Sequence, residues 1–481
     1  MAASNLKEKT AKGIFWGGLS NVTQQLIGMF IGIQMARIVG VEDYGLVGML
    51  AVFSGIATTI INSGFTTALV NKPELTHKDC NAVFWFTVIA GILCYAILFF
   101  AAPLIAIFFN QPRLTALSRV LFLCFLISGI SSVSYTILFK QLRIKTLALT
   151  DITAMLLSGA VGIAMAFHGF GYWALAFQSL VYVSTGAIMR FILAPWKPTF
   201  TFDLSPLKSF FSFSVKLFLT NIIGQISSNL FSIVLGKFYD EKKVGFYSQG
   251  SKWMFMGHSL IAGMLNSVAQ PVLVSTNETP ERQRQVFYKL MRFGAFVSFP
   301  LMLGLAFVGK EFILLAIGEK WLDSVIYLQL FCIWGAIGYA NILYSMLLVT
   351  HGKSDIYMTV TLLVSALQFA AACLLYPWGI TVMVVGYILS YIAGVFVWHG
   401  YAHKYVGIRL WTVIKEMLPY IGATLASFAA ASIATRPFEN IALIFTLKIA
   451  VSAIVYLGIL WISGSKLLKE AIAFGLYRKI E

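Results

Sequence analysis

The sequence predicts an all-α integral membrane protein with about fourteen transmembrane helices. Of its 481 residues, 59% are hydrophobic and only 11% are charged, and the mean hydropathy is +0.83. A soluble domain carries about 25% charged residues, so a chain this apolar could not cover its surface in water. The apolar residues also fall into long runs with short polar breaks, which is the pattern of repeated membrane crossings.

Each predicted helix is an apolar run of about the 20 residues needed to cross the hydrocarbon core. The runs cover residues 13–36, 45–70, 82–109, 114–138, 146–168, 170–194, 210–236, 244–274, 291–317, 322–350, 355–377, 379–399, 412–435 and 439–463. Turn residues mark the breaks, as in His168-Gly169 and Pro377-Trp378-Gly379. No small-residue cleavage site follows a short apolar core near the start, so we expect the first run to be a retained helix.

The basic residues predict the topology. An even number of helices places both termini on one side. If that side is cytoplasmic, 24 Lys and Arg residues fall in inside segments and 8 in outside segments. Inside loops carry such an excess, so we expect both termini in the cytoplasm. The net charge of +16 is spread between apolar runs; topology explains it, and nucleic acid is not an expected partner.

A weak internal repeat predicts the domain organisation. Residues 62–70 match residues 266–274 at an offset of 204, and Phe170-Gly171 matches Trp378-Gly379 at an offset of 208. These matches predict two six-helix lobes followed by a C-terminal helix pair. The predicted bounds are 1–194 for the N-lobe, 195–209 for a cytoplasmic linker, 210–403 for the C-lobe, and 404–481 for helices 13–14 and a cytoplasmic tail.

Six helices per lobe make the repeats parallel, related by an axis along the membrane normal. Repeated lobes suggest alternating access, although repeats also occur in channels.

Four predicted helices carry polar residues on one side, at 100° per residue. They are the first two helices of each lobe. The residues are Asn21 and Gln25, Thr58 and Asn62, Asn221, Gln225 and Asn229, and Lys252, Asn266 and Gln270. A polar row must face protein or water. Packing between helices through amides is one reading; because the rows are repeat-related, we expect a shared hydrated cavity.

Two charged residues inside apolar runs are candidates for function. Lys252 could bind a phosphate on the polar side of helix 8, or its ammonium could extend to the outer interface. Asp151 could relay a cation, or could pair with Lys145 or Arg143.

Sites for catalysis, nucleotides or metals are not predicted. Gly352-Lys353-Ser354 resembles the end of a P-loop, but Leu347 replaces the first glycine. His399 and His403 are four residues apart without a carboxylate or cysteine to complete a zinc site. There is no nucleophile–base constellation. We therefore expect neither an enzyme nor a cofactor, with coupling to Na⁺ or H⁺ left open.

Several stretches resemble the Wzx-like lipid-linked oligosaccharide flippases, a branch of the superfamily of multidrug, oligosaccharidyl-lipid and polysaccharide exporters. The similarity covers nearly the whole chain and looks nearest to the colanic-acid-exporter-like group. The stretches that carry it are Lys7–Trp16, Ala36–Gly45, Asn62–Val70, Leu138–Lys140, Gly169–Leu175, Trp196–Pro198 and Leu235–Tyr247. The family often has an aspartate late in helix 7, where this chain has Asn229, which argues against ion coupling there.

The resemblance implies a bacterial inner-membrane protein that moves an undecaprenyl-pyrophosphate-linked oligosaccharide from the cytoplasmic to the periplasmic leaflet. Its partners would be this substrate and membrane lipids, and could include other polysaccharide-assembly proteins. One alternative is a drug or metabolite exporter of the same fold, but few carboxylates line the predicted cavity to bind cationic drugs. Another is a membrane polymerase or ligase, which would need a longer outward segment than residues 237–243.

Overall fold

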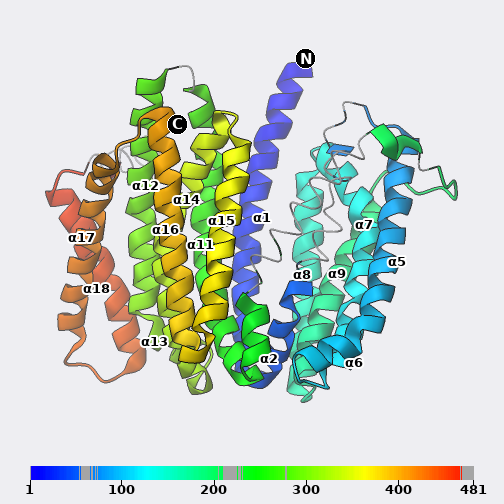
Figure 1. The fold of residues 1–481 in the computed structure, drawn as a ribbon, viewed down its shortest axis with the longest axis horizontal. Coiled ribbons are helices and arrows are strands. Elements are labelled where there is room, and N and C mark those ends of the chain that lie inside the picture. Colours follow the sequence, from blue (N-terminus) through cyan, green and yellow to red (C-terminus); the bar gives the residue numbers. More distant parts are fainter. Residues whose placement is uncertain are drawn as a thin grey trace. The chain divides into compact units, whose positions relative to one another are not determined.

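The computed structural model describes residues 2–53, 74–203, 205–209, 231–276 and 279–465, and the isolated residues 55, 66, 69, 70, 72, 225, 229, 467 and 468. The regular structure in this part of the chain is helical, and ten of its helices are long and apolar enough to cross a membrane (Figure 1). The predicted all-α membrane fold is therefore confirmed. The second and seventh predicted spans lie mostly outside the described residues. The helices Ala2–Ile38 and Glu241–Ser275, at the first and eighth predicted spans, are not among these ten, so the count of fourteen stays a prediction.

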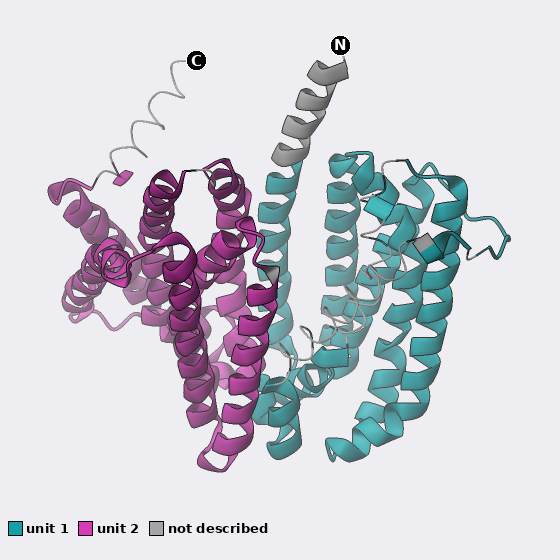
Figure 2. Ribbon diagram, turned by 45° about the horizontal axis from the view of Figure 1, so that its top comes forward, with its two compact units in different colours: residues 1–245 teal, residues 246–481 magenta. Residues whose placement is uncertain are grey.

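One compact unit comprises Met1–Gly245 (teal in Figure 2). Its long helices are α1 (Ala2–Ile38), α5 (His77–Phe108), α7 (Leu123–Lys140), α8 (Ile144–Phe167) and α9 (Tyr172–Leu193), with the shorter α2 (Val41–Met49), α6 (Leu114–Leu121) and η1 (Ser205–Ser209). α5 packs against α7, α7 against α9, and α9 against α8, which also contacts α1. Buried apolar side chains such as Val83 and Val133 hold α5 to α7.

The second compact unit comprises Phe246–Glu481 (magenta in Figure 2). Its helices are most of α11 (Glu241–Ser275), α12 (Pro280–Phe307), α13 (Gly309–Ala316), η2 (Glu319–Ser324), α14 (Val325–Thr350), α15 (Ser354–Leu375), η3 (Tyr376–Trp378), α16 (Ile380–Val406), α17 (Leu410–Thr435) and α18 (Ile441–Ile462). α12 packs against α14, α14 against α16, and α16 against α15. This is the packing order of α5, α7, α9 and α8. The exact lobe and linker bounds stay predictions.

Glycines with positive φ lie between helices at two of the predicted breaks. α8 ends at Phe167 and is followed by Gly169, which has φ +79°. Gly379, with φ +97°, directly precedes α16. A side chain would strain the backbone at these angles, whereas glycine adopts them freely.

Two ion pairs attach the C-terminal helices α17 and α18 to the rest of their unit. The Arg292 guanidinium on α12 binds both carboxylate oxygens of Glu416 on α17, with Nη2 2.7 Å from Oε1. The Lys448 ammonium on α18 lies 2.8 Å from Glu311 Oε1 on α13. A charge inside an apolar layer needs such a partner, so these contacts define where the extra helix pair docks.

Candidate functional site

α11 has one face packed against its own unit. Met254 and Leu265 are buried on this face. A Cβ atom added at Gly257 would lie only 2.6 Å from Met302 Cε on α12. The close approach that Gly257 permits fixes which side of α11 faces the helix bundle.

The opposite face of α11 is polar and exposed. Ser259, Asn266 and Gln270 are all exposed, and a Cβ atom added at Gly263 between them would meet nothing within 4 Å. Such a row in a membrane protein must face water or another protein surface. Two predicted cavity residues, Asn266 and Gln270, therefore share an open face.

Lys252 lies on this polar side of α11, about two turns before Ser259. Its side chain is half-buried, and Nζ lies 5.4 Å from the centre of the Trp253 ring, a cation–π contact. α11 begins at Glu241 rather than at the predicted residue 244, so Lys252 lies about 16 Å along the helix at about 1.5 Å per residue. Its role as a phosphate ligand stays a prediction.

The amides of the first unit are arranged differently. Asn229 Nδ2 donates to the main-chain carbonyl of Gln225 at 3.0 Å and to its side-chain Oε1 at 3.2 Å. A Cβ atom added at Gly55 would lie 2.6 Å from Gln225 Oε1. This amide pair therefore packs against a glycine of the second predicted helix. Of the two interpretations of the polar row, packing between helices applies to this pair.

The other predicted residues of this unit are only partly described. On α1, Asn21 is exposed and Gln25 is half-buried. Thr58, Asn62 and Asn221 lie outside the described residues. We find one packed amide pair here, and no assembled site among the residues that are described in this unit.

Asp151 forms an ion pair, but not with a predicted partner. Its Oδ1 lies 2.5 Å from Arg190 Nη2 on α9, and the guanidinium also lies over the ring of Tyr135 at 5.3 Å. The predicted partners Lys145 and Arg143 were wrong, because the Lys145 ammonium points to the Trp16 ring at 5.0 Å. Neighbours in sequence suggested those partners, whereas the α8–α9 contact supplies the real one.

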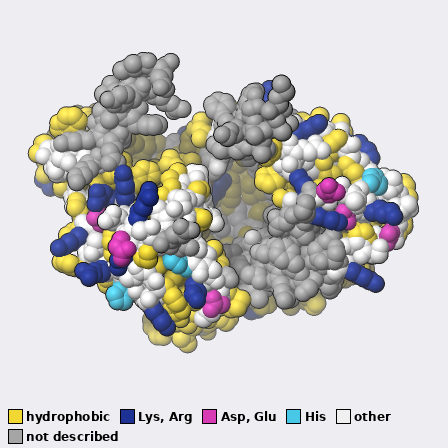
Figure 3. Space-filling view, turned by 90° about the horizontal axis from the view of Figure 1, so that it is seen from above, with side chains coloured by type: hydrophobic (Ala, Val, Ile, Leu, Met, Phe, Trp, Pro, Cys, Tyr) yellow, Lys and Arg dark blue, Asp and Glu magenta, His cyan; other side chains and the backbone are white. Residues whose placement is uncertain are grey.

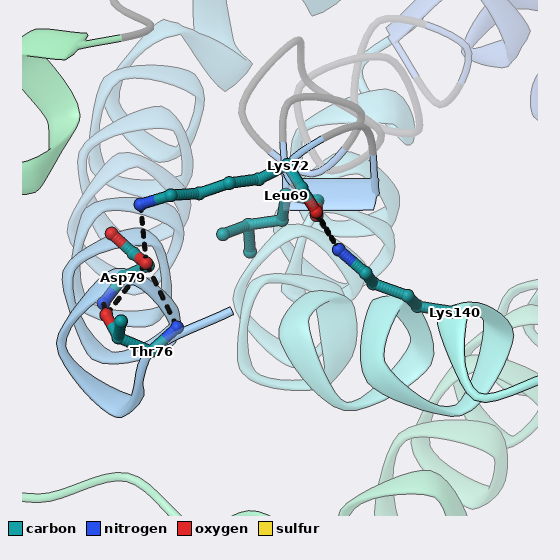
Figure 4. Close-up of polar contacts among 5 residues, drawn as sticks. All are labelled: Leu69, Lys72, Thr76, Asp79 and Lys140. Atoms are coloured by element: carbon teal, nitrogen blue, oxygen red, sulfur yellow. Dashed lines mark hydrogen bonds and ion pairs between the residues drawn. The ribbon is translucent and has the colours of Figure 1, made fainter. Parts of the chain in front are cut away.

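Polar contacts join three chain segments of the first unit: residues 69–72, the start of α5 and the end of α7 (Figure 4). Asp79, in the first turn of α5, accepts hydrogen bonds through Oδ2 from Lys72 Nζ at 2.7 Å and from Thr76 Oγ1 at 2.7 Å. Lys140, the last residue of α7, donates to the Leu69 carbonyl at 3.3 Å and to the Lys72 carbonyl. We call this group the charged junction. It supplies partners for carbonyls at the end of the second predicted helix, which a helix end otherwise leaves without them.

A neutral junction occupies the corresponding place in the second unit. Gln283, in α12, donates through Nε2 to the Leu273 carbonyl near the end of α11 at 3.2 Å. Its Oε1 contacts His351 Nε2 at 2.8 Å, just after α14. Leu69 and Leu273 are the residues that the repeat pairs at an offset of 204. The sequence analysis missed both junctions, although Thr76 and Asp79 have the spacing of a capping box.

The two helical histidines that the sequence set aside have other partners. His399 Nδ1 contacts the Tyr344 hydroxyl at 2.9 Å, and His403 Nδ1 contacts the Ile408 carbonyl at 2.9 Å. These are ordinary hydrogen bonds between neighbouring segments of one unit.

Comparison with solved structures identifies the fold. The fold resembles that of the lipid II flippase MurJ in its inward closed conformation, with a TM-score of 0.77 and 16% identity over 94% of this chain and 99% of that chain. At this identity the likeness shows the fold alone.

The family follows from the sequence. A family model described as polysaccharide biosynthesis protein matches residues 34–326, more than half of the chain. The chain belongs to this family. It is 28% identical over 302 residues to the teichuronic acid biosynthesis protein TuaB of Bacillus subtilis, a match to 62% of each chain. It is 23% identical over 437 residues to the lipopolysaccharide biosynthesis protein WzxC of Escherichia coli, covering 88% of each chain.

These comparisons confirm the predicted resemblance at the level of the family. They group the chain with multi-pass bacterial membrane proteins of polysaccharide biosynthesis, and its fold with that of the lipid II flippase MurJ.

Proposed function

We propose that this protein moves a lipid-linked oligosaccharide from the cytoplasmic to the periplasmic leaflet by alternating access. The observation that carries the proposal is the exposed polar face of α11 in a membrane protein of the polysaccharide biosynthesis family. The amides of Asn266 and Gln270 both donate and accept hydrogen bonds, as sugar hydroxyls do. A carrier for an apolar substrate would gain nothing from this row.

Lys252 is the proposed contact for the phosphate groups of the lipid carrier. It places one cation on the same side of α11 as the exposed amides. Charge-assisted hydrogen bonds to phosphate are stronger than neutral ones, and an anionic substrate would offset the cost of holding a cation in the membrane. The exposed polar residues of this face, Ser259, Asn266 and Gln270, are all uncharged. Without a carboxylate among them they would bind a cationic drug poorly, which disfavours the alternative of a cationic-drug exporter.

The proposed orientation has both termini in the cytoplasm. Each unit displays many Lys and Arg side chains on the face that Figure 3 shows (dark blue). An excess of basic residues is typical of the cytoplasmic side. With the cell interior negative, each negative charge carried outward gains about 2.3 kcal/mol per 100 mV, so an anionic substrate favours export.

Transport in reconstituted vesicles tests the proposal. The assay loads a fluorescent oligosaccharide on a polyprenyl pyrophosphate and measures how much becomes accessible to a glycosidase on the other side. We expect Lys252→Gln to lower the transport rate at least tenfold and Lys252→Arg to retain most of it. Lys243→Gln, an exposed cation in the first turn of the same helix, is the matched control and should transport normally.

Two results would decide against parts of the proposal. Transport at the wild-type rate by Lys252→Gln would remove the phosphate-binding role and leave interfacial positioning. Absence of transport by the wild-type protein, with uptake of a cationic dye instead, would favour the drug exporter.

Coupling to an ion gradient is proposed not to run through Asp151, because its carboxylate is bound to Arg190. If an imposed Na⁺ or H⁺ gradient changes the rate, Asp151→Asn should leave that dependence intact. Loss of the dependence in Asp151→Asn would assign the coupling to this residue.

A further inference from the structure

The segment after α9 is fixed along the first turns of α5. Asn81, which is buried, donates through Nδ2 to the Thr201 carbonyl at 2.7 Å and accepts from the Thr199 main-chain N–H through Oδ1 at 2.9 Å. The Trp85 indole N–H donates to the Thr199 carbonyl at 2.8 Å. One amide and one indole thus bind the backbone of this segment much as a neighbouring strand would.

A second contact fixes the beginning of the same segment. The Trp196 indole N–H donates to His77 Nδ1 at 2.9 Å, and His77 Nε2 contacts Thr199 Oγ1 at 3.2 Å. Residues 196–202 are therefore attached to α5 at several points rather than at one.

The attachment turns two phenylalanines outward. The Thr199 and Thr201 hydroxyls form hydrogen bonds to His77 and Asn81 of α5, whereas the rings of Phe200 and Phe202, at the alternate positions, are 87% and 63% exposed. The Phe202 ring lies 4.4 Å and the Phe200 ring 5.8 Å from the Trp85 ring. We call Trp85, Phe200 and Phe202 the aromatic arm. Such exposure is costly in water, because large apolar side chains gain free energy when they leave it.

The location of the arm indicates what covers it. α5, which begins at His77, and α9, which ends at Leu193, are both long and apolar enough to cross a membrane, and the arm lies at the ends of these two helices. Aromatic side chains are enriched at this level in membrane proteins. Lys78 and Lys208 are both exposed. They lie in the first turn of α5 and in η1, on either side of the arm in sequence.

We propose that the aromatic arm is a lipid-binding surface. Phe200 and Phe202 insert at the boundary between headgroups and acyl chains, and the ammonium groups of Lys78 and Lys208 contact the phosphates of anionic phospholipids. The polar attachment to Asn81 keeps the arm at a constant depth. This proposal does not depend on the proposed function, because it concerns the membrane around the protein and not the transported molecule.

A fluorescent label tests the insertion directly. In a cysteine-free background, an environment-sensitive nitrobenzoxadiazole label is attached at position 200 or, as the matched control, at position 203, where Asp203 is exposed in the same segment. The labelled proteins are placed in nanodiscs that contain phospholipids brominated near the headgroup. We expect blue-shifted emission and strong quenching at position 200, and water-like emission with little quenching at position 203.

Equal, water-like emission at both positions would overturn the proposal. Protection at position 200 in native membranes but not in lipid nanodiscs would also overturn it, since the arm would then bind another protein.

A change of lipid tests the role of the lysines. Quenching at position 200 should rise at least twofold when phosphatidylglycerol replaces phosphatidylcholine, and the double variant Lys78→Gln/Lys208→Gln should remove this increase. Quenching that does not depend on lipid charge would overturn the phosphate contact. Melting temperatures of the variants, measured in parallel, show that the fold is retained.

Discussion

Replacing Asp79 by alanine should destabilise the first unit by removing the centre of the charged junction. The Asp79 side chain is only 4% exposed and its Oδ2 accepts from Lys72 Nζ and from the hydroxyl and main-chain N–H of Thr76. The Thr76 hydroxyl can still cap α5, because the main-chain N–H of residue 79 that it accepts from is kept. The loss of the reciprocal hydrogen bonds from Thr76 to the carboxylate costs about 0.5–1.5 kcal/mol, and the loss of the charge-assisted hydrogen bond from Lys72 about 1.5–3 kcal/mol. Lys72 is 36% exposed and can turn to water, so we expect about 2–4 kcal/mol in total.

The assay is thermal unfolding in detergent, followed with a thiol-reactive dye. A loss of this size corresponds to a fall of about 5–10 °C for a unit of about 250 residues. Asp79→Asn keeps an acceptor for the cap and should lose about half as much. Glu281→Ala is the control, because Glu281 also lies in a first helical turn and pairs with a basic residue, Arg284, but is exposed. If the melting temperatures of Asp79→Ala and Glu281→Ala both equal that of the wild type, the charged junction does not stabilise the unit.

Two further predictions concern the second unit. Cysteines that replace the exposed Asn266 or Gln270 should react with a charged thiol reagent, whereas a cysteine that replaces the buried Leu265 should not. If all three cysteines are equally protected, protein covers this face of α11. Burial and the Lys353 ammonium lower the pKa of His351, in the turn after α14. The folded protein favours the neutral imidazole, so the contribution of His351 to stability is complete above its ordinary pKa of about 6.5 and is lost as the pH falls. The melting temperature of the wild type should therefore fall more between pH 7.5 and 5.5 than that of His351→Gln. Equal falls would contradict this prediction.

Among the described residues, hydropathy predicted the long helices but not all their ends. The ninth run was predicted from residue 291, whereas α12 begins at Pro280. Its first turns carry Arg282, Arg284 and Lys289, which no hydropathy window counts as membrane. Proline at the first helical position and an acidic residue after it are helix-start signals. The helix therefore extends beyond the apolar run, as a helix end in water can.

Only part of the candidate site could be predicted. The angular position of a residue on its helix follows from the sequence, whereas the residue that it contacts on a neighbouring helix does not. The exposed side of α11 could be placed from its 3.6-residue period. Whether such a side is open or packed depends on the facing helix. Gln225 and Asn229 have the same residue types as Asn266 and Gln270, yet Gly55 brings a helix against them. The partner of Asp151 was missed for the same reason, since Arg190 lies 39 residues away.

The two junctions explain why the internal repeat is so faint in sequence. Both provide partners for carbonyl groups near the end of a polar-faced helix, at Leu69 and Leu273. The physical requirement is that each carbonyl has a donor, and an ammonium group meets it as well as a side-chain amide does. Lys140 is such a donor in one unit and Gln283 in the other. Lys140 lies at the end of α7, whereas Gln283 lies near the start of α12, which takes the place of α5 in the packing order. The donor therefore comes from a different helix in each unit, so the hydrogen bond to the carbonyl does not require the two units to have the same residue type at matching positions.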